Sequence, residues 1–328
     1  MKKYLIIRFS SIGDIVLTTP VVRCLKEQTN AQVHYLSKAQ FSSILKPNPF
    51  IDKLHFINKD VDEVIPELKA EGFDEIIDLH NNLRTLRIKR ALGIKSTSFE
   101  KHNVAKWFLV NLKWNTLPNV HIVDRYIATV KHLGVVNDMK GLDYFLTKED
   151  EVDLKNFEEG NWYGKPFVAF VIGGQHEGKM CSTKKIIEIC KRIEQPVLLF
   201  GGPEDQQKGA EIEKACQPNV LNIAGKFSLG QSAFILSKAS VVITHDTGLM
   251  HIAAAFNKKI ISLWGGTVPE LGMYPYLPGE GSQILEVKHF MRPSSKLGSR
   301  KGIYRLWNFM DMIPTDKIVS AIQEKTTP

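Results

Sequence analysis

The stretch SVVITHDTGLMHIAAAFNKKIISLWGG (240–266) decides the fold of this chain. It starts with an apolar run typical of a buried strand, turns at Asp246, Thr247 and Gly248, continues with helical spacing and ends in a second apolar run. Asp246 and Thr247 suit a helix N-cap, and Gly248 lets the backbone approach a ligand closely. Strand, turn, helix and strand in this order predict one βαβ unit of a parallel sheet.

The turn in this stretch is also typical of a phosphate site. Free N–H groups and the helix dipole attract anions to the start of a helix, and the diphosphate of a nucleotide sugar fits there. His251 follows within the first helical turns, within reach of a phosphate or a sugar hydroxyl. Taken alone, the motif leaves a second interpretation open, in which Asp246 and Thr247 only cap a core helix and His251 is an ordinary buried histidine.

Apolar runs alternate with segments of helical spacing on both sides of this stretch. The strand-like runs lie at 4–9, 31–38, 53–58, 74–80, 167–174, 196–202, 219–225, 240–246 and 258–266. Such alternation favours parallel sheets covered by helices on both faces. We therefore predict an α/β protein with two Rossmann-like domains, each built on a doubly wound parallel sheet.

The alternation loosens between residues 100 and 160, which ends in the acidic, linker-like TKEDEVDLKNFEEG (147–160). We predict a first domain at 1–155, a second at 156–305 and a helical segment at 306–328 that need not belong wholly to the second domain. Ligands of such sheets bind outside the carboxyl ends of the strands, so the loops of the two domains should face an interdomain cleft.

A second polar loop follows the first predicted strand, in RFSSIGDIVLTTP (8–20). Ser10, Ser11 and Gly13 form this loop, and Asp14 lies at the head of the next helix. A carboxylate at the mouth of a cleft can accept a proton from an attacking hydroxyl, which is general-base catalysis. In isolation, the simpler interpretation of Asp14 as an N-cap is favoured.

Composition and charge limit the class of protein. The 328 residues are 43% hydrophobic, and 43 Lys and Arg against 35 Asp and Glu give a formal net charge of +8. This charge favours an acidic partner, either a phosphorylated sugar, an anionic glycolipid or nucleic acid. The first apolar run is broken at Arg8, too early for a signal peptide or a membrane span, which predicts a cytoplasmic protein. Four cysteines without metal-ligand spacing predict free thiols.

Several of these segments resemble the signature segments of one family, the heptosyltransferases of glycosyltransferase family 9. The resemblance rests on SSIGDIVLTTPVVRCLK (10–26) and DTGLMHIAAAF (246–256), and continues in order through DEIIDLHNNLR (74–84), GGPED (201–205) and the text from 222 to 248. It weakens from about 95 to 160. The resemblance implies the two-domain GT-B fold, in which the last helix often crosses back to the first domain, and the transfer of heptose from ADP-heptose to lipopolysaccharide.

The resemblance also assigns catalytic roles. Asp14 matches the proposed catalytic base, and Lys179 matches a lysine that contacts the donor phosphate and offsets charge on the departing ADP. The loop residues beside the base are Ser10, Ser11 and Gly13. The donor-binding positions that match are Asp246, Thr247, Gly248, Leu249 and His251. Glu204 lies where an acidic residue would bind the ribose hydroxyls. Without this context, a lysine on a glycine-rich loop is usually a solvated side chain.

We expect this chemistry to need no metal and no cofactor besides the ADP-sugar. The only DxD text, DVD (60–62), lies at a charged helix start and is assigned to solvent. A lysine and a helix amino terminus can stabilise a diphosphate leaving group instead of a cation. Asp14 would then deprotonate the acceptor hydroxyl, which attacks the anomeric carbon in line with the departing ADP and inverts its configuration.

The chain departs from the family pattern at two places. Cys181 and Ser182 follow Lys179 where relatives usually have an aromatic residue and a proline, and Ser294 and Ser295 replace a cysteine-bearing stretch of some relatives. No metal or disulfide role is expected for the second place. Its basic residues, Arg292, Lys296, Arg300 and Lys301, could meet an anionic acceptor, although a solvated loop is the favoured interpretation.

Three alternatives stay open at this point. The changes at Cys181 and Ser182 suggest a nucleotide-sugar-binding protein whose transferase activity has decayed. An NAD-dependent oxidoreductase would share the doubly wound halves, but no GxGxxG follows a strand. Nucleic-acid binding rests on charge alone and is not expected. The predicted partners are an ADP-sugar and an anionic acceptor, the lipopolysaccharide core or another surface glycan, and the positive charge is compatible with peripheral contact at the inner membrane face.

Overall fold

The computed structural model describes residues 1–157, 165–299 and 302–324. These residues form two compact units, one of Met1–Lys101 with Val120–Phe145 and one of His102–Asn119 with Leu146–Pro328. The predicted boundary at residue 155 thus differs from this division. Segment 102–119 groups with the second unit because Leu109 packs against Val268 and Leu271, and Lys113 Nζ donates to the Pro293 carbonyl at 2.7 Å.

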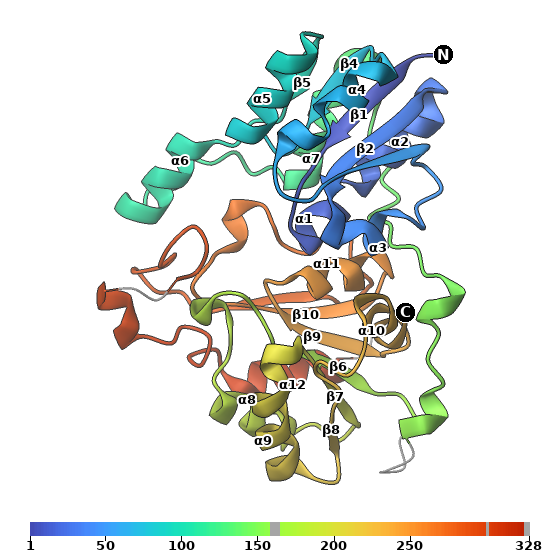
Figure 1. Ribbon diagram of the computed structural model, residues 1–328. Helices are drawn as coiled ribbons and strands as arrows, with labels where there is room; N and C mark the ends of the chain where they lie inside the picture. The colour runs from blue at the N-terminus through green and yellow to red at the C-terminus, as the bar shows by residue number, and fades with distance from the viewer. Residues whose placement is uncertain (158–164, 300–301, 325–328) are drawn as a thin grey trace. The chain divides into compact units, whose positions relative to one another are not determined.

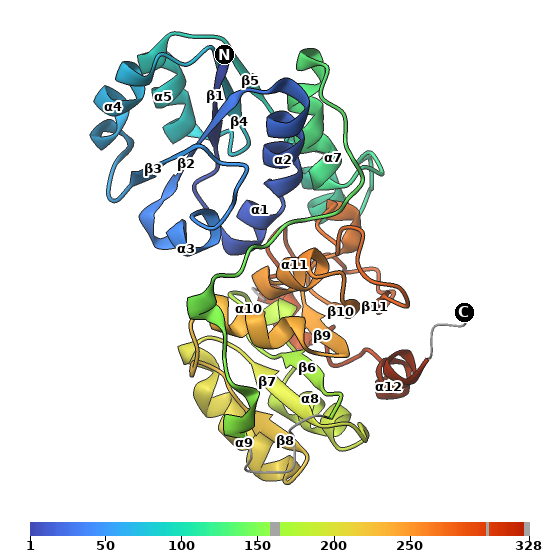
Figure 2. The same cartoon turned by 90° about the vertical axis from the view of Figure 1, so that its right-hand side faces the viewer.

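The first unit is built on a five-stranded parallel sheet in the order β3-β2-β1-β4-β5 (Figure 2). Its strands are β1 (Lys3–Ile7), β2 (Gln32–Lys38), β3 (Lys53–Ile57), β4 (Glu75–Asp78) and β5 (Ser96–Ser98). Its helices are α1 (Ile12–Val16), α2 (Thr19–Thr29), α3 (Ser42–Leu45), α4 (Ile65–Glu71), α5 (Leu83–Leu92) and α7 (Ile122–Ile127), with 3-10 turns η1 (Ala39–Phe41), η2 (Val61–Glu63) and η4 (Ala128–Leu133).

The second unit repeats this design with a six-stranded parallel sheet in the order β11-β10-β9-β6-β7-β8 (Figure 1 and Figure 2). Its strands are β6 (Val168–Val171), β7 (Val197–Phe200), β8 (Val220–Asn222), β9 (Val241–His245), β10 (Lys259–Trp264) and β11 (Gln283–Glu286). Its helices are α6 (Asn103–Trp107), a π-helix η3 (Phe108–Leu112), α8 (Thr183–Cys190), α9 (Gln206–Cys216), α10 (Leu229–Ser237), α11 (Gly248–Ala255) and α12 (Thr315–Gln323). The 3-10 turns are η5 (Lys148–Asp150), η6 (Leu154–Phe157), η7 (Glu177–Lys179), η8 (Pro203–Asp205), η9 (Pro269–Leu271) and η10 (Gly302–Leu306).

In both parallel sheets, the side on which successive strands are added changes once. The strand order runs outward from β1 in one direction and from β4 in the other, and β6 and β9 play these parts in the second sheet. This is the Rossmann order, which places ligand sites at the carboxyl ends of the two strands at the reversal. The predicted α/β fold with two Rossmann-like parallel sheets of the GT-B type is confirmed. The sequence missed β5 and β11, edge strands of three and four residues that lack a buried apolar run.

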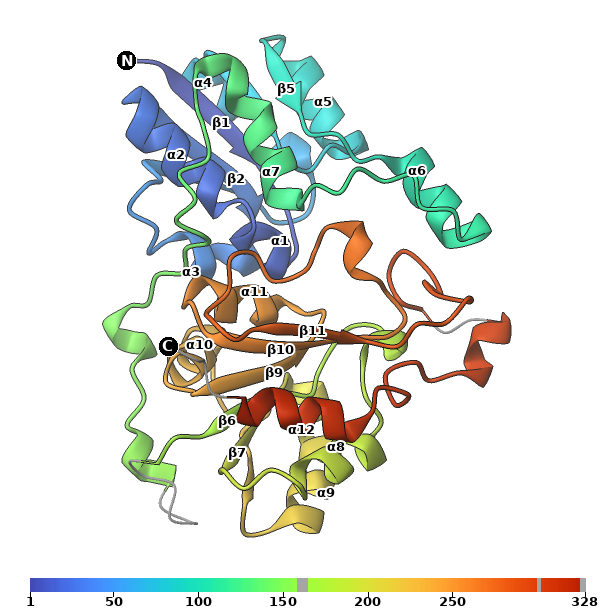
Figure 3. The same ribbon diagram turned by 180° about the vertical axis from the view of Figure 1, so that it is seen from behind.

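The carboxy-terminal helix covers the second sheet. α12 packs against α8, β10 and β11 (Figure 3), and its buried Ile318 and Ile322 belong to the apolar core of this unit. The expected segment 306–328 therefore contributes its described helix to the second unit, and its residues 325–328 lie outside the described part. Among the residues that the structure describes, no helix has the length and apolar character needed to cross a membrane.

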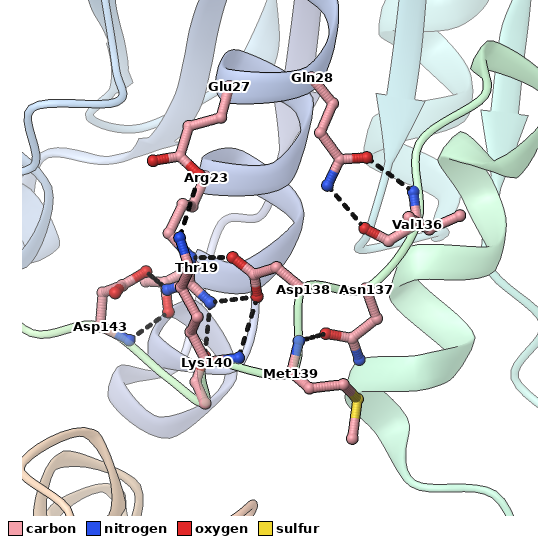
Figure 4. A network of polar contacts seen from close by, with 11 residues as sticks. Thr19, Arg23, Glu27, Gln28, Val136, Asn137, Asp138, Met139, Lys140 and Asp143 are labelled. Atoms are coloured by element: carbon pink, nitrogen blue, oxygen red, sulfur yellow. Dashed lines mark hydrogen bonds and ion pairs between the residues drawn. The ribbon is translucent and has the colours of Figure 1, made fainter.

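A polar network ties α2 to the last stretch of the first unit (Figure 4). The buried Arg23 guanidinium donates to both carboxylate oxygens of Asp138 at 2.8 and 2.9 Å and pairs with Asp143. The Asp143 N–H in turn donates to Thr19 Oγ1 at 2.8 Å, and Gln28 exchanges two hydrogen bonds with the Val136 backbone. A bidentate arginine pair of this kind fixes geometry as well as adding energy, so it holds residues 136–143 on α2.

A buried histidine pair between β2 and β3 makes the first unit sensitive to acid. His34 Nδ1 lies 3.0 Å from His55 Nε2, and both side chains are buried. Burial and the neighbouring His55 lower the pKa of His34 from 6.5 to about 4. The unfolded chain protonates His34 near pH 6.5, whereas the folded chain does so only near pH 4. Protonation of the unfolded chain therefore lowers the free energy of unfolding by about 2–3 kcal/mol as the pH drops from above 6.5 to 4.5.

Urea unfolding at pH 7.5 and 4.5, followed by hydrogen exchange of β2 amides, measures this loss in the first unit. We expect His34→Gln to lose less stability than the wild type between the two pH values, by about 2 kcal/mol. Exchange in β2 is the readout because a chain with two units need not unfold in a single step. Equal losses for the two proteins would contradict the role of His34.

Candidate active site

Most of the predicted site residues lie at the carboxyl ends of the strands that flank the reversal, in the loops or in the first turns of the helices that follow. In the first unit, Ser10 to Asp14 follow β1, and His80 follows β4. In the second unit, the glycine-rich loop with Lys179 follows β6, and Asp246 to Gly248 follow β9. Each unit therefore gathers one group of site residues for the reason that the strand order gives.

Asp14 is the centre of the first group. Its side chain is 24% exposed, Oδ1 lies 2.5 Å from Arg8 Nη2, and Oδ2 accepts from Ser11 Oγ at 2.8 Å. Ser11 is the N-cap of α1, and its N–H also reaches Asp14 Oδ2 at 3.2 Å. The carboxylate is thus at the helix start, as predicted, and the capping box orients it instead of leaving it as a simple N-cap.

Arg8 forms the ion pair that holds Asp14, and the sequence analysis did not identify it as a site residue. The guanidinium is buried and donates to the carbonyls of Ser10 and Leu79 at 2.8 and 2.6 Å and to Tyr126 Oη at 3.0 Å. These bonds occupy three sides of the guanidinium and leave Nη2 aimed at Asp14. A carboxylate fixed in this way has one orientation toward a substrate hydroxyl, which favours general-base catalysis.

His80 and Arg84 lie beside this group. The His80 ring packs on Phe9 with centroids 4.9 Å apart, and Arg84 lies over the same Phe9 ring at 5.7 Å. Burial and the charges of Arg8 and Lys101 lower the pKa of His80 to about 4, so the imidazole is neutral at physiological pH. The loop LHNNLR was expected near the site, but nothing in its pattern marked His80.

Lys179 and Asp246 form the centre of the second group. Lys179 Nζ lies 2.7 Å from Asp246 Oδ2, which also accepts from Thr267 Oγ1 at 3.1 Å. Both side chains of the pair are mostly buried. The structure therefore brings together two predicted residues that are far apart in the sequence. A half-buried ammonium beside a helix start is suited to bind an anion.

The backbone leaves room for Lys179 at one glycine. Gly298 has a φ of +74°, and a Cβ at this position would lie 2.8 Å from Lys179 Cγ. A residue with a side chain would therefore strain the backbone and push the lysine stem away. Gly298 belongs to the segment 290–302 that the sequence assigned to a basic patch, so part of this segment instead packs over Lys179.

The amino terminus of α11 adjoins the Lys179–Asp246 pair. Thr247 is the N-cap, but its side chain makes no capping bond and instead lies 3.3 Å from Thr244 Oγ1. The first N–H groups, those of Gly248 and Leu249, therefore have no side-chain cap, which suits an anion site. His251 lies one turn further and is buried. Its predicted contact with the donor stays a prediction.

Glu204 lies on the neighbouring loop, after β7. Glu204 is exposed in the turn η8. Its carboxylate lies against Gly202, where a Cβ would come within 2.4 Å of it. The next residue, Asp205, is buried and accepts from the Gly202 N–H at 2.9 Å. Asp205 packs so closely on Gly173 and Gly201 that neither position has room for a Cβ. Asp205 thus fixes the loops after β6 and β7, while Glu204 is left accessible to a ligand.

The first departure from the family pattern, at Cys181 and Ser182, has a structural explanation. Ser182 is the N-cap of α8 and accepts from the Lys185 N–H at 3.2 Å. Cys181 is buried, and burial raises the pKa of its thiol to about 12, so it is not reactive. Its N–H donates to His245 Nε2 at 3.3 Å. All four cysteines are free and buried, which confirms the predicted free thiols.

The predicted basic patch at 290–302 needs correction. Arg292 is buried and donates to four backbone carbonyls, those of Trp264, Gly265, Thr267 and Val287. It also pairs with Glu286 at 2.8 Å. Arg292 is therefore a structural residue of the loop after β10 and cannot meet an acceptor. Lys296 is exposed as expected, and Arg300 and Lys301 lie outside the described residues.

Two groups of acidic and histidine residues bear on metal binding. The DVD carboxylates Asp60 and Asp62 are both exposed at the start of η2 and pair with Arg87. Within the described part of the chain, one cluster has ligand atoms within 4.8 Å of one another, namely His34, His55 and Glu71. Lys3 and Lys53 already donate to Glu71, and the two histidines bond each other. Neither group lies at the carboxyl ends of β1 and β4.

Fold and site together define a class. Two Rossmann-like sheets of the GT-B type carry an oriented carboxylate in one unit and a lysine at a helix amino terminus in the other. This combination fits a glycosyltransferase of the GT-B type.

Comparison with known proteins narrows the class to a family. A family model described as glycosyltransferase family 9 (heptosyltransferase) matches residues 62–279, more than half of the chain. The chain therefore belongs to glycosyltransferase family 9 and is a glycosyltransferase. Lipopolysaccharide heptosyltransferase 1 of Campylobacter coli is 25% identical over 288 residues, 81% of this chain and 84% of that protein.

Solved structures share the fold. A glycosyltransferase family 9 protein from Veillonella parvula DSM 2008 has a TM-score of 0.78 at 22% identity, over 98% of this chain and 96% of that one. The E. coli heptosyltransferase WaaC with ADP has a TM-score of 0.63 at 17% identity, over 86% and 92% of the two chains.

Proposed function

We propose that this protein transfers heptose, or a related sugar, from an ADP-sugar to a hydroxyl of the lipopolysaccharide core or another surface glycan, with inversion and without a metal. The relatives named as lipopolysaccharide heptosyltransferases and the E. coli structure with ADP support the choice of donor and acceptor. The observation that carries the donor site is the Lys179–Asp246 pair beside the amino terminus of α11.

The donor diphosphate would bind at this amino terminus. The Gly248 and Leu249 N–H groups and the Lys179 ammonium supply the positive potential that a divalent cation supplies in other transferases. Glu204, accessible on the next loop, would accept hydrogen bonds from the ribose hydroxyls. Asp246, Thr247 and His251 would complete the contacts to the sugar and diphosphate, as the family resemblance implies.

The sugar would be transferred in a single displacement at its anomeric carbon. Asp14 takes the proton of the acceptor hydroxyl while that oxygen forms a bond to the anomeric carbon of the heptose. The bond from that carbon to the ADP oxygen breaks, and ADP leaves with the electron pair, its charge offset by Lys179. One displacement inverts the anomeric configuration. Ser10, Ser11 and Gly13 shape the loop that holds Asp14.

The acceptor would be an anionic glycolipid, which brings the enzyme to the inner face of the membrane. Arg84 lies exposed over the Phe9 ring, which also contacts His80, and is suited to a phosphate or carboxylate of such an acceptor. The net charge of +8 favours peripheral contact with an anionic lipid surface.

Calorimetric titration with ADP and ADP-heptose, without and with EDTA, tests the metal-free donor site. We expect both ligands to bind with the same affinity in either condition, and the heptose product, analysed by NMR, to have the inverted configuration. Binding that EDTA abolishes would contradict the metal-free proposal. Binding of ADP-heptose without turnover on any lipopolysaccharide-core acceptor would favour the decayed transferase instead.

A further inference from the structure

An apolar and basic surface in the second unit has no role in the site described above. It is formed by residues 103–114 on α6 and η3 together with residues 288–297 and 302–306 around η10, which we call the docking patch. Its large exposed apolar side chains are Val104, Trp107, Leu112, Trp114, Phe290, Leu297, Ile303 and Leu306. Trp107 is 55% exposed, Trp114 62% and Phe290 77%. Isolated exposed apolar residues are ordinary, but a concentration of this kind marks an interaction site.

The two segments are bonded to each other, which places them side by side in the second unit. Lys113 Nζ donates to the Pro293 carbonyl at 2.7 Å and to Tyr304 Oη at 3.0 Å, and it lies 5.2 Å from the Tyr304 ring centroid. Lys296 Nζ reaches Asn103 Oδ1 at 3.3 Å at the other end. These contacts hold the α6–η3 segment against the loop that follows β11.

The helical segment presents apolar residues on both faces. Leu109 is buried against Val268 and Leu271, which anchors one face to the second unit. On the other face Val104, Trp107 and Leu112 are exposed, where a helix in water would carry polar residues. Tryptophans at such positions are typical of helices that lie in the plane of a membrane interface.

The charge around the patch selects its partner. The chain has no Asp or Glu at 101–119 or at 287–310, while Lys288 and Lys296 are exposed within the patch. A surface of tryptophan, phenylalanine and lysine without carboxylates complements an anionic lipid headgroup layer, and each lysine near such a layer contributes about 1 kcal/mol.

We propose that the docking patch binds the enzyme to an anionic lipid bilayer, with Trp107, Trp114 and Phe290 inserted at headgroup depth. This inference rests on the proposed function, since a glycolipid acceptor is presented at such a surface. Gly298, next to Leu297, packs over Lys179, so the variants described below leave residues 297–299 unchanged and should keep the chemistry intact.

Co-sedimentation with lipid vesicles tests the proposal. The wild type should bind vesicles of phosphatidylglycerol and phosphatidylethanolamine, bind phosphatidylcholine vesicles at least about tenfold more weakly, and be released at 0.5 M NaCl. Trp107→Ser with Trp114→Ser, and separately Lys288→Glu with Lys296→Glu, should each weaken binding about tenfold or more. Val136→Ser with Met139→Ser, which removes two exposed apolar side chains from the first unit, is the matched control and should bind like the wild type.

Two further readouts separate the patch from the reaction. The tryptophan double variant should bind ADP-heptose and turn over a delipidated, water-soluble acceptor like the wild type. If no acceptor is turned over by any form, the proposed function fails, but vesicle binding still decides the patch. Equal binding of wild type and tryptophan variant to anionic vesicles overturns the proposal. So does a wild-type dimer in light scattering that the tryptophan variant abolishes, because the patch would then join two copies of the chain.

Discussion

Replacing Asp14 with asparagine is expected to lower kcat for sugar transfer by about 10²–10⁴-fold, the usual contribution of a general base. The asparagine amide can still accept the Ser11 hydroxyl bond but cannot take a proton from the acceptor. The Kd for ADP-heptose should stay within about threefold, because the donor contacts that we propose lie in the second unit. Steady-state kinetics with a core acceptor and calorimetry with the donor measure the two effects.

The Asp14 experiment needs a control for the ion pair with Arg8. Asp74→Asn removes an exposed carboxylate that pairs with Lys2 at the start of the sheet and should keep full activity. Thermal unfolding of both variants shows whether the first unit remains folded after Arg8 loses its partner. A fall in kcat below tenfold in a folded Asp14→Asn protein would exclude Asp14 as the base.

Replacing Lys179 with alanine should weaken ADP binding and lower kcat/KM for transfer, each by about 10–100-fold, from the loss of one charge-assisted contact to phosphate. The loss should lie at the upper end of this range, because Asp246 keeps its charge beside the diphosphate and loses the ammonium that neutralised it. Calorimetry with ADP and steady-state kinetics measure the two quantities.

A double variant separates these two causes. Lys179→Ala with Asp246→Asn should bind ADP more tightly than Lys179→Ala alone, since the repelling charge is gone. Lys184→Ala, an exposed lysine on the first turn of α8, is the matched control and should bind ADP like the wild type. If Lys179→Ala binds ADP with unchanged affinity, the phosphate site lies elsewhere.

The alternation of apolar runs with segments of helical spacing was enough to predict most of the strands and helices. Pro20 falls in the first turn of α2, where its missing N–H removes no helical hydrogen bond, and Gly72 ends α4 with a φ of +65°, which glycine adopts without strain. The apolar runs became the buried strands of two parallel sheets because a strand covered on both faces needs apolar residues at every position. The same reasoning could not find β5, whose residues Ser96–Ser98 are polar and lie at an edge.

The partners of the site residues were not predictable in this way. Asp14 was found by its motif, but Arg8 is fixed by Leu79 and Tyr126, whose distance along the chain hides the contact. Arg292 looked like a surface cation in sequence and is instead buried among backbone carbonyls. A charge pattern reports composition and not depth, so only packing distinguishes the two cases.

The sequence by itself determined the two parallel sheets, the positions of the loops between strands and helices, and the family, because strand, helix and turn are set by contacts between near neighbours. The tertiary structure decided which loops meet. The order of strands places β1 beside β4 and β6 beside β9, and this order comes from hydrogen bonds between strands that are distant in sequence. Lys179 therefore reaches Asp246 only after both strands have paired in the folded sheet.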